Sequence, residues 1–151
     1  MVIHCTQSFV DSDQKYTEYF NKYPYPLSDF QKWAIYAIIN GHHSLITAHT
    51  GSGKTLPAEF AIEYFKSKGK KVIYTGPIKA LCNQKLYDFK QKFPNISFGI
   101  LTGDIKDNPE ADVLIMTTEI LRNTLFNKKI NNRNSDSKPI ELQFDLDIES
   151  E

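Results

Sequence analysis

Eight consecutive residues, AHTGSGKT at positions 48–55, have the types and spacing of a phosphate-binding loop. Gly51 and Gly53 lack a Cβ atom, so the backbone there can adopt positive φ and bring successive N–H groups close to phosphate oxygens. The ammonium group of Lys54 can reach the β- and γ-phosphates of a nucleotide, and the hydroxyl of Thr55 can ligate the Mg²⁺ that bridges them. We therefore predict that this loop binds a nucleoside triphosphate together with magnesium.

The flanks of this loop favour the same prediction. The apolar run before it predicts a strand over 44–48, and the run after it predicts a helix that ends near Ser67, with Gly69 as its stop. A helix that starts at the loop points its free N–H groups and its positive dipole end at the anion. Pro57 falls in the first helical turn, where no intrahelical hydrogen bond is lost. The loop residues predicted to hold the nucleotide are Ala48, His49, Thr50, Gly51, Ser52, Gly53, Lys54 and Thr55.

The composition is that of an ordinary globular protein of one domain. The 151 residues are 40% hydrophobic and 24% charged, and the formal net charge is zero, so no overall basic field indicates a polyanion partner. Charge is nevertheless unevenly placed, because eight lysines and the single acid Asp88 lie between Lys66 and Lys92. This run is either a solvated helical face or a surface for a polyanion.

The two cysteines and the N-terminus indicate where the protein works. Cys5 and Cys82 are far apart and lack metal-ligand spacing, which is typical of a reducing compartment. The N-terminal residues contain no apolar signal segment, and no stretch approaches the length of a membrane span. We therefore expect an intracellular, soluble protein without membrane contact, in the cytoplasm or in the nucleus.

The order of the remaining elements predicts an α/β fold. Helical spacing is found over 29–40, 79–93 and 119–126, and β-branched or apolar runs predict strands over 71–75, 97–101 and 112–116, with a polar loop over 102–109. The apolar residues at helical spacing in the first of these helices are Phe30, Trp33, Ala34, Ala37 and Ile38, and those expected to face inward in the second are Ala80, Leu81, Leu86, Phe89 and Phe93. Strands that alternate with helices in this way form a mostly parallel sheet, with ligands at the carboxyl ends of the strands. We expect residues 1–22 to be a loosely attached arm, 127–139 a mobile insertion, and 140–148 a half-exposed strand.

Several motifs in addition to the loop carry a resemblance to one family. They are YPYPL at 23–27 with Asp29-Phe30-Gln31, PIKALCNQK at 77–85, TGD at 102–104 and NPEADVLIMTTEILRN at 108–123. In this order and spacing the chain resembles, over about residues 23–126, the superkiller-type, exosome-associated DExH-box RNA helicases of superfamily 2. The resemblance implies that residues 23–151 are a RecA-like ATPase domain, which we expect to be C-terminally incomplete.

The resemblance also implies roles for particular residues. Gln31 matches the glutamine that reads the adenine edge, and Tyr25 matches the aromatic that stacks on the base. Three segments match those that hold the nucleic-acid backbone, namely Pro77, Ile78 and Lys79; Thr102, Gly103 and Asp104; and Thr117, Thr118 and Arg122. The implied ligands are ATP, Mg²⁺ and single-stranded RNA, with DNA left open. Without the family, these residues would read as a turn aromatic, a surface glutamine, an ordinary turn and a helix N-cap.

One part of the family pattern is absent from this sequence. The DExH sequence, which supplies the second magnesium-binding carboxylate and positions the attacking water, does not occur in the 151 residues. The nearest acids are Glu119, which we assign to a nucleic-acid loop, and Asp145 and Asp147, which we assign to the polar face of a strand. We therefore expect the N-terminal part of a helicase that binds nucleotide and RNA weakly, turns over little ATP, and tends to self-associate through uncovered sheet edges.

Two other functional classes stay open at this point. A nucleotide- or RNA-binding module without hydrolysis would differ from an enzyme in lacking RNA-stimulated phosphate release. A small P-loop kinase or another ATPase would need a basic lid, and with arginine only at 122 and 133 no arginine-rich lid is visible.

Overall fold

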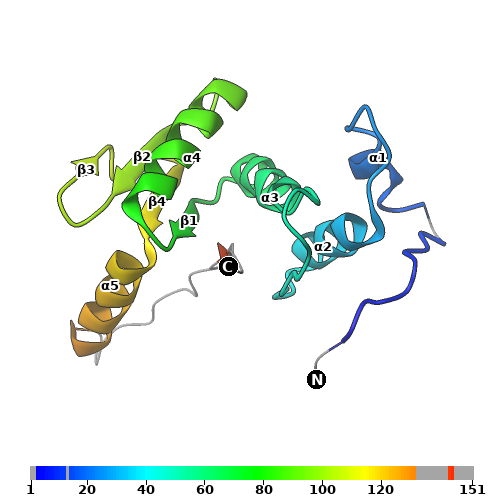
Figure 1. Ribbon diagram of the computed structural model, residues 1–151, viewed down its shortest axis with the longest axis horizontal. Helices are drawn as coiled ribbons and strands as arrows, with labels where there is room; N and C mark the ends of the chain where they lie inside the picture. The colour runs from blue at the N-terminus through cyan, green and yellow to red at the C-terminus, as the bar shows by residue number, and fades with distance from the viewer. Residues whose placement is uncertain (1–2, 13, 132–142, 145–151) are drawn as a thin grey trace. The chain divides into compact units, whose positions relative to one another are not determined.

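The computed structural model describes residues 3–12, 14–131 and 143–144 (Figure 1). The chain divides into two compact units, Met1–Tyr64 and Phe65–Glu151. The first unit holds helices α1 (Thr17–Phe20) and α2 (Asp29–Ile39) and most of α3 (Thr55–Ser67). The second unit holds a sheet with helices α4 (Lys79–Lys92) and α5 (Thr118–Asn131). The strand and helix alternation of the second unit confirms the predicted α/β class.

Helix α2 forms where its spacing predicts it. The backbone N–H of Ser28 donates to the side-chain carbonyl oxygen of Gln31 at 3.0 Å, which is half of a capping box at the helix N-terminus. Gly41 follows the helix with φ of +68°, the left-handed conformation that commonly ends a helix. The buried face consists of Gln31, Ala34, Ile35 and Ile38, so the expected inward positions 30, 33 and 37 are only half-buried.

The N-terminal segment is attached to α2 more closely than expected. The ring of Phe9 lies 4.9 Å from that of Trp33 and 5.4 Å from that of Phe20, both edge to face. The indole N–H of Trp33 donates to the carbonyl of Gln7 at 2.8 Å, and the N–H of Phe9 donates to the carboxylate of Asp29 at 3.0 Å. The aromatics of this segment pack from an irregular chain, which is why they show no helical or strand period. The boundary at residue 22 stays a prediction.

The strand expected over 44–48 is absent. The described residues of the first unit contain helices and no strand, so this segment has no neighbouring strand with which to form a ladder. The side chain of Leu45 is 81% exposed. An apolar run becomes a strand only when a sheet satisfies its N–H and C=O groups, and the sequence pattern does not report whether that sheet is present.

In the second unit, five strands of the described chain form one sheet in the order β3-β2-β4-β1-β5. The strands are β1 (Val72–Gly76), β2 (Phe98–Leu101), β3 (Lys106–Asp107), β4 (Val113–Thr117) and β5 (Gln143–Phe144). Neighbours among β2, β4, β1 and β5 run parallel, whereas β3 is antiparallel to β2 at the edge. Strand β3 lies inside the expected loop over 102–109. Strand β5 lies inside the expected strand over 140–148, whose other residues, including Asp145 and Asp147, are outside the described residues.

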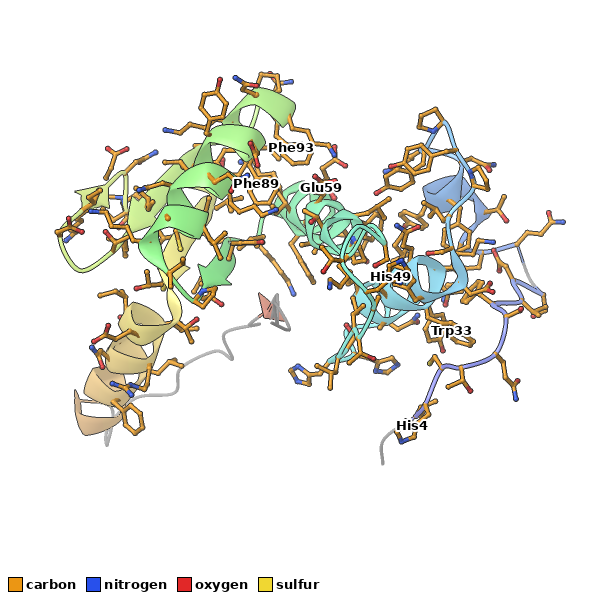
Figure 2. All side chains as sticks on the ribbon, viewed as in Figure 1. His4, Trp33, His49, Glu59, Phe89 and Phe93 are labelled. Carbon is orange, nitrogen blue, oxygen red and sulfur yellow. The ribbon has the colours of Figure 1, made fainter. Side chains whose placement is uncertain are left out.

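Helix α4 closes one aromatic core against the sheet. Phe89 is 1% exposed and packs edge to face on Tyr74 of β1 at 5.3 Å, with Phe98 of β2 at 6.0 Å and Phe93 at 6.2 Å (Figure 2). These contacts confirm the predicted inward positions at 89 and 93 and explain why this helix lies on the sheet.

Two expectations about the helices of the second unit are corrected. Ala80 is exposed and Cys82 is fully buried, because Cys82 lies next to Gly76, where an added Cβ would meet its Sγ at 3.0 Å. Helix α5 continues to Asn131, past the expected end at Phe126, so the predicted insertion does not begin at Asn127. Residues 132–139 of that insertion lie outside the described residues.

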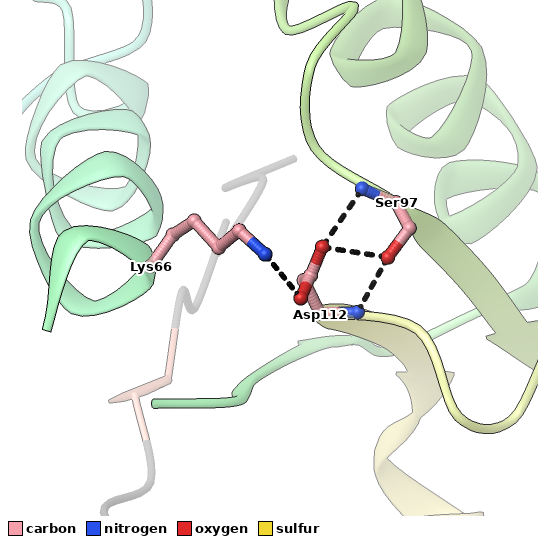
Figure 3. Close-up of polar contacts among 3 residues, drawn as sticks. All are labelled: Lys66, Ser97 and Asp112. Carbon is pink, nitrogen blue, oxygen red and sulfur yellow. Dashed lines mark hydrogen bonds and ion pairs between the residues drawn. The ribbon is translucent and has the colours of Figure 1, made fainter. Parts of the chain in front are cut away.

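A polar network fixes the amino ends of β2 and β4 (Figure 3). The carboxylate of Asp112 accepts hydrogen bonds from the N–H and the hydroxyl of Ser97 at 3.1 and 2.7 Å, and the Ser97 hydroxyl oxygen accepts from the N–H of Asp112 at 2.9 Å. The ammonium of Lys66 lies 2.5 Å from the other carboxylate oxygen. These partners lower the pKa of Asp112 from 3.8 to about 2, Lys66 first and Ser97 second. The predicted ligand segments lie at the other end of these strands, after their carboxyl ends.

Candidate functional site

The loop at 48–55 has a backbone suited to binding an anion. Gly51 and Gly53 have φ of +79° and +85°, the region that disfavours side chains, so both glycines are required by the conformation. The N–H of Ser52 donates to the carbonyl of His49 at 3.3 Å, which closes a turn with Gly51 at its third position. Helix α3 then begins at Thr55. The loop therefore ends at the positive pole of a helix of 13 residues, where phosphate is stabilised.

The lysine of the loop makes a hydrogen bond that joins the two ends of the loop. The ammonium of Lys54 donates to the carbonyl oxygen of Ala48 at 2.7 Å, and the side chain is partly buried. Lys54 therefore lies beside the backbone turn that would surround a phosphate, and a phosphate oxygen would replace a neutral carbonyl as its acceptor. The Thr55 hydroxyl, in the first turn of α3, is a group that could ligate Mg²⁺. Among the described residues, no group of three or more His, Cys, Asp or Glu side chains could hold a metal ion.

Gln31 lies against the loop in the same unit. Its side-chain amide donates to the carbonyl of Gly53 at 3.1 Å, while its carbonyl oxygen accepts from Ser28. Gln31 is 6% exposed, and a Cβ added at Gly53 would lie 2.6 Å from its nitrogen. A side chain at position 53 would displace the Gln31 amide from this contact, while the positive φ is what favours glycine there. The resemblance placed Gln31 at the nucleotide, but the sequence did not indicate its hydrogen bond to the carbonyl of Gly53.

Tyr25, by contrast, makes no hydrogen bond to the loop within the described part of the chain. It is 53% exposed, and its ring lies 6.1 Å from that of Tyr23. An exposed aromatic face of this kind is available for stacking on a base. Burial, followed by the charges of Glu63 and Glu59, raises the pKa of the neighbouring Tyr23 to about 12, so its hydroxyl stays protonated at neutral pH.

In the second unit, the three segments predicted to hold nucleic acid meet at one edge of the sheet. Residues 77–79 follow β1, 102–104 follow β2 and 117–122 span the end of β4 and the start of α5. The register pairs Gly76 with Thr117 and Leu101 with Met116, so these parallel strands end side by side. The hydroxyl of Thr118 donates to the carbonyl of Gly76 at 3.2 Å and joins two of the segments. Arg122 is exposed on α5.

An ion pair joins the first and second of these segments. The Lys79 ammonium pairs with the Asp104 carboxylate, whose other oxygen accepts from the Thr102 hydroxyl at 3.0 Å. That hydroxyl also accepts from the N–H of Ile105 at 3.2 Å, and Thr102 is buried. Lys79 and then Thr102 lower the pKa of Asp104, so it is a carboxylate at neutral pH. Of this group, Lys79 keeps an exposed cation, whereas the Thr102 hydroxyl is already used within its turn.

The sequence did not reveal that Lys79 and Asp104 pair. The signal was present, because opposite charges follow two strands that a parallel sheet places close together, but the strand order was unknown. Glu119, which lies within the third segment, is exposed in the first turn of α5. None of the helices in the described chain is both long and apolar enough to cross a membrane.

Comparison with known proteins is consistent with this geometry. Residues 28–142 match the family model described as DEAD/DEAH box helicase. The chain is 49% identical over 104 residues to antiviral helicase SKI2 of Saccharomyces cerevisiae, covering 69% of this chain and 8% of that protein. It is 47% identical over 100 residues to DExH-box ATP-dependent RNA helicase DExH9 of Arabidopsis thaliana, covering 66% and 10%.

A third relative gives the same picture. Over 105 residues the chain is 45% identical to human exosome RNA helicase MTR4, covering 70% of this chain and 10% of that protein. The chain therefore spans about a tenth of the length of each of these relatives.

Proposed function

Because the chain belongs to the DEAD/DEAH box helicase family, we propose that it supplies the ATP-binding portion of an ATP-dependent RNA helicase. In that proposal the longer protein couples ATP hydrolysis to unwinding of RNA or to movement along it. This chain contributes the nucleotide loop and one nucleic-acid surface.

The loop geometry carries the nucleotide half of the proposal. Two glycines with positive φ, a lysine 2.7 Å from a loop carbonyl, and a threonine at the start of a helix form the set of groups that a triphosphate with Mg²⁺ requires. Gln31 and Tyr25 would then receive the adenine, the first through an amide that already contacts the loop and the second through an exposed ring.

The arrangement of the sheet edge supports the nucleic-acid half. Backbone N–H groups at the strand ends, with the exposed cations of Lys79 and of Arg122 on α5, would bind phosphates without reading bases. Such contacts also leave DNA as a substrate, because nothing among these groups selects the 2′-hydroxyl of ribose. RNA is preferred here because two of the relatives described above are named RNA helicases.

Hydrolysis by this chain alone is expected to be slow. Phosphoryl transfer needs a carboxylate that binds Mg²⁺ and a group that orients water, and the sequence contains no DExH motif to supply them. Glu119 lies in one of the three segments proposed to hold nucleic acid, and Asp145 and Asp147 lie outside the described residues.

Phosphate release from Mg·ATP, measured with and without single-stranded RNA, tests the proposal, with Lys54→Ala as the control. We expect nucleotide binding that the variant loses, RNA binding that it keeps, and little turnover by either protein. Nucleotide binding of equal strength in Lys54→Ala would overturn the site assignment. Turnover that RNA stimulates would show that an acid already in this chain completes the site.

A second candidate is a nucleotide- and RNA-binding module with no hydrolytic role, which would use the same loop and the same groups at the strand ends. The two candidates can be distinguished by adding the remaining part of a related helicase to this chain, either as a separate protein or as a fusion. A binding module would stay inactive, whereas the ATP-binding portion of a helicase would gain ATP turnover that RNA stimulates. The family match counts against a small P-loop kinase.

A further inference from the structure

Gly76 is the point where two of the three strand-end segments meet. It is the last residue of β1, and the register pairs it with Thr117, the last residue of β4. The hydroxyl of Thr118, the first residue of α5, donates to the carbonyl oxygen of Gly76 at 3.2 Å. A carbonyl oxygen only accepts, and a threonine hydroxyl has one proton to donate. While this bond is made, Thr118 has no donor left for a phosphate, whose oxygens also only accept.

The carbonyl of Gly76 leads directly into the segment 77–79. Pro77 carries no N–H, so this carbonyl is the only hydrogen-bonding group of the peptide unit between the two residues. Because a peptide unit is planar, holding its oxygen restricts the direction in which the chain leaves the strand. Only Pro77 and Ile78 separate the end of β1 from Lys79, where α4 begins. The orientation of this one peptide unit therefore affects where Lys79 lies.

A second contact also constrains Gly76. A Cβ added there would lie 3.0 Å from the Sγ of Cys82, which is fully buried. The N–H of Cys82 donates to the carbonyl of Ile78 at 3.2 Å, in the first turn of α4. Cys82 thus fixes the start of α4 against the end of β1. The Thr118 hydrogen bond then fixes that junction relative to the third segment.

We propose that Thr118 is a positioning residue for nucleic-acid binding. Its hydroxyl holds the segment 77–79 so that the exposed ammonium of Lys79 is placed to contact the phosphate backbone, and it does not itself bind phosphate. The inference rests on the proposed nucleic-acid binding, and it replaces the direct contact that the family resemblance implies for Thr118. It also has a distinctive consequence, because a substitution that changes no charge should alter the salt dependence of binding.

Binding of single-stranded RNA by Thr118→Val, measured by fluorescence anisotropy over a range of salt concentrations, tests the inference. Valine keeps the shape of threonine without the hydroxyl, so the affinity should fall about threefold, the effect of one neutral hydrogen bond. The slope of log affinity against log salt should fall by part of the roughly 0.7 that one neutralised phosphate contributes on a single strand. Thr118→Ser keeps the hydroxyl and should bind as the wild type does.

Thr124→Val is the matched control on the same helix. The hydroxyl of Thr124 donates to the carbonyl of Ile120 within α5 at 2.8 Å, so this variant also loses a hydrogen bond from side chain to backbone, but one that does not reach the strand ends. Its RNA affinity and salt slope should equal those of the wild type. In a Lys79→Ala background, Thr118→Val should change the affinity little, because the lysine through which it acts is already absent.

A second measurement needs no RNA. NMR relaxation gives the backbone order parameters of Ile78 and Lys79, which report motion of the segment on the picosecond to nanosecond timescale. They should fall in Thr118→Val and keep the wild-type values in Thr118→Ser and Thr124→Val. Order parameters that stay unchanged in Thr118→Val would overturn the positioning role.

The outcomes separate this inference from the function on which it rests. If the wild-type chain fails to bind RNA, the proposed nucleic-acid function fails, and the inference fails with it. If the wild type binds and Thr118→Val weakens binding with an unchanged salt slope, also in the Lys79→Ala background, the hydroxyl contacts phosphate directly and the inference alone is overturned. Equal binding by Thr118→Val and the wild type, or an equal loss in Thr124→Val, would also overturn it.

Discussion

The ammonium group of Lys54 donates a 2.7 Å hydrogen bond to the carbonyl oxygen of Ala48, the residue six positions earlier at the start of the same loop. The cation proposed to bind phosphate is thus held inside the loop by the loop's own backbone. For an ammonium group a phosphate oxygen is a stronger acceptor than a carbonyl, because its negative charge adds Coulombic attraction to the hydrogen bond. We therefore expect a phosphate oxygen to replace the Ala48 carbonyl as the partner of Lys54.

Replacement of Lys54 by alanine should weaken Mg·ATP binding by at least about tenfold, because a charge-assisted hydrogen bond to phosphate is lost. Folding stability should change little, since the Ala48 carbonyl can then bond to water at the partly exposed loop. Titration calorimetry measures the first effect and urea unfolding the second. Lys90→Ala, an exposed lysine on α4, is the control for loss of positive charge. Equal weakening in both variants would mean that general electrostatics, and not this site, attracts the nucleotide.

Gly99→Ala should destabilise the second unit by about 2–4 kcal/mol, in the range of a severe steric change in a core. Gly99 lies in the buried strand β2, and a Cβ there would lie 2.0 Å from the carbonyl oxygen of Asn108, which belongs to backbone that cannot move aside cheaply. Gly103→Ala is the matched control, because an added Cβ at that position meets nothing within 4 Å. The midpoint of urea unfolding reports both. A Gly99→Ala protein as stable as Gly103→Ala would contradict this packing.

Most of the fold of the second unit could be predicted because its signals are local. The strands near Val72, Phe98 and Val113 are short apolar runs with helical spacing between them, and burial of such runs on both faces is typical of parallel strands. Strand β3 was missed because Lys106 and Asp107 are exposed and polar. These two residues pair with β2 because the turn after Leu101 reverses the chain and places them antiparallel to that strand.

What could not be predicted depends on partners that are distant in sequence. The run at 44–48 has the composition of a strand, but a strand exists only beside another strand. The contact between Gln31 and Gly53, and the docking of Phe9 on Trp33, join residues more than twenty positions apart. Roles for the loop residues could be proposed from the sequence because a loop of this type carries its chemistry in consecutive residues. The ion pair between Lys79 and Asp104 could not be predicted without the strand order.

The stability of the second unit should fall as the pH decreases from about 4 to about 2. The Lys66 ammonium and the Ser97 donors hold the pKa of Asp112 at about 2, below its ordinary 3.8. The unfolded chain therefore binds this proton more readily than the folded chain, so the contribution of Asp112 is complete above pH 4 and is lost as the pH falls through 2. Urea unfolding of the wild type and Asp112→Asn at pH 6, 4, 3 and 2 measures it.

In that series the free energy of unfolding of the wild type should exceed that of Asp112→Asn by about 1 kcal/mol at pH 6, as expected for a half-exposed ion pair with supporting hydrogen bonds. This difference should shrink toward pH 2. Glu110→Gln serves as the control, because its carboxylate is paired with Lys71 but is 88% exposed. A difference that stays constant from pH 6 to pH 2 would show that packing, and not the charge of Asp112, is responsible.

Lys79→Ala should weaken binding of single-stranded RNA several-fold and equally for unrelated sequences, because the contact is to phosphate. The slope of log affinity against log salt should fall by about 0.7, the value for one phosphate neutralised on a single strand. Asp104→Asn should have the opposite effect, since it frees Lys79 from its ion pair and removes a negative charge from the same edge of the sheet. Fluorescence anisotropy over a range of salt concentrations measures both variants, with Lys90→Ala at the far end of α4 as the control. If Lys79→Ala changed the affinity but left the salt slope unaltered, the lysine would act on the shape of the edge through Asp104 and would not bind phosphate itself.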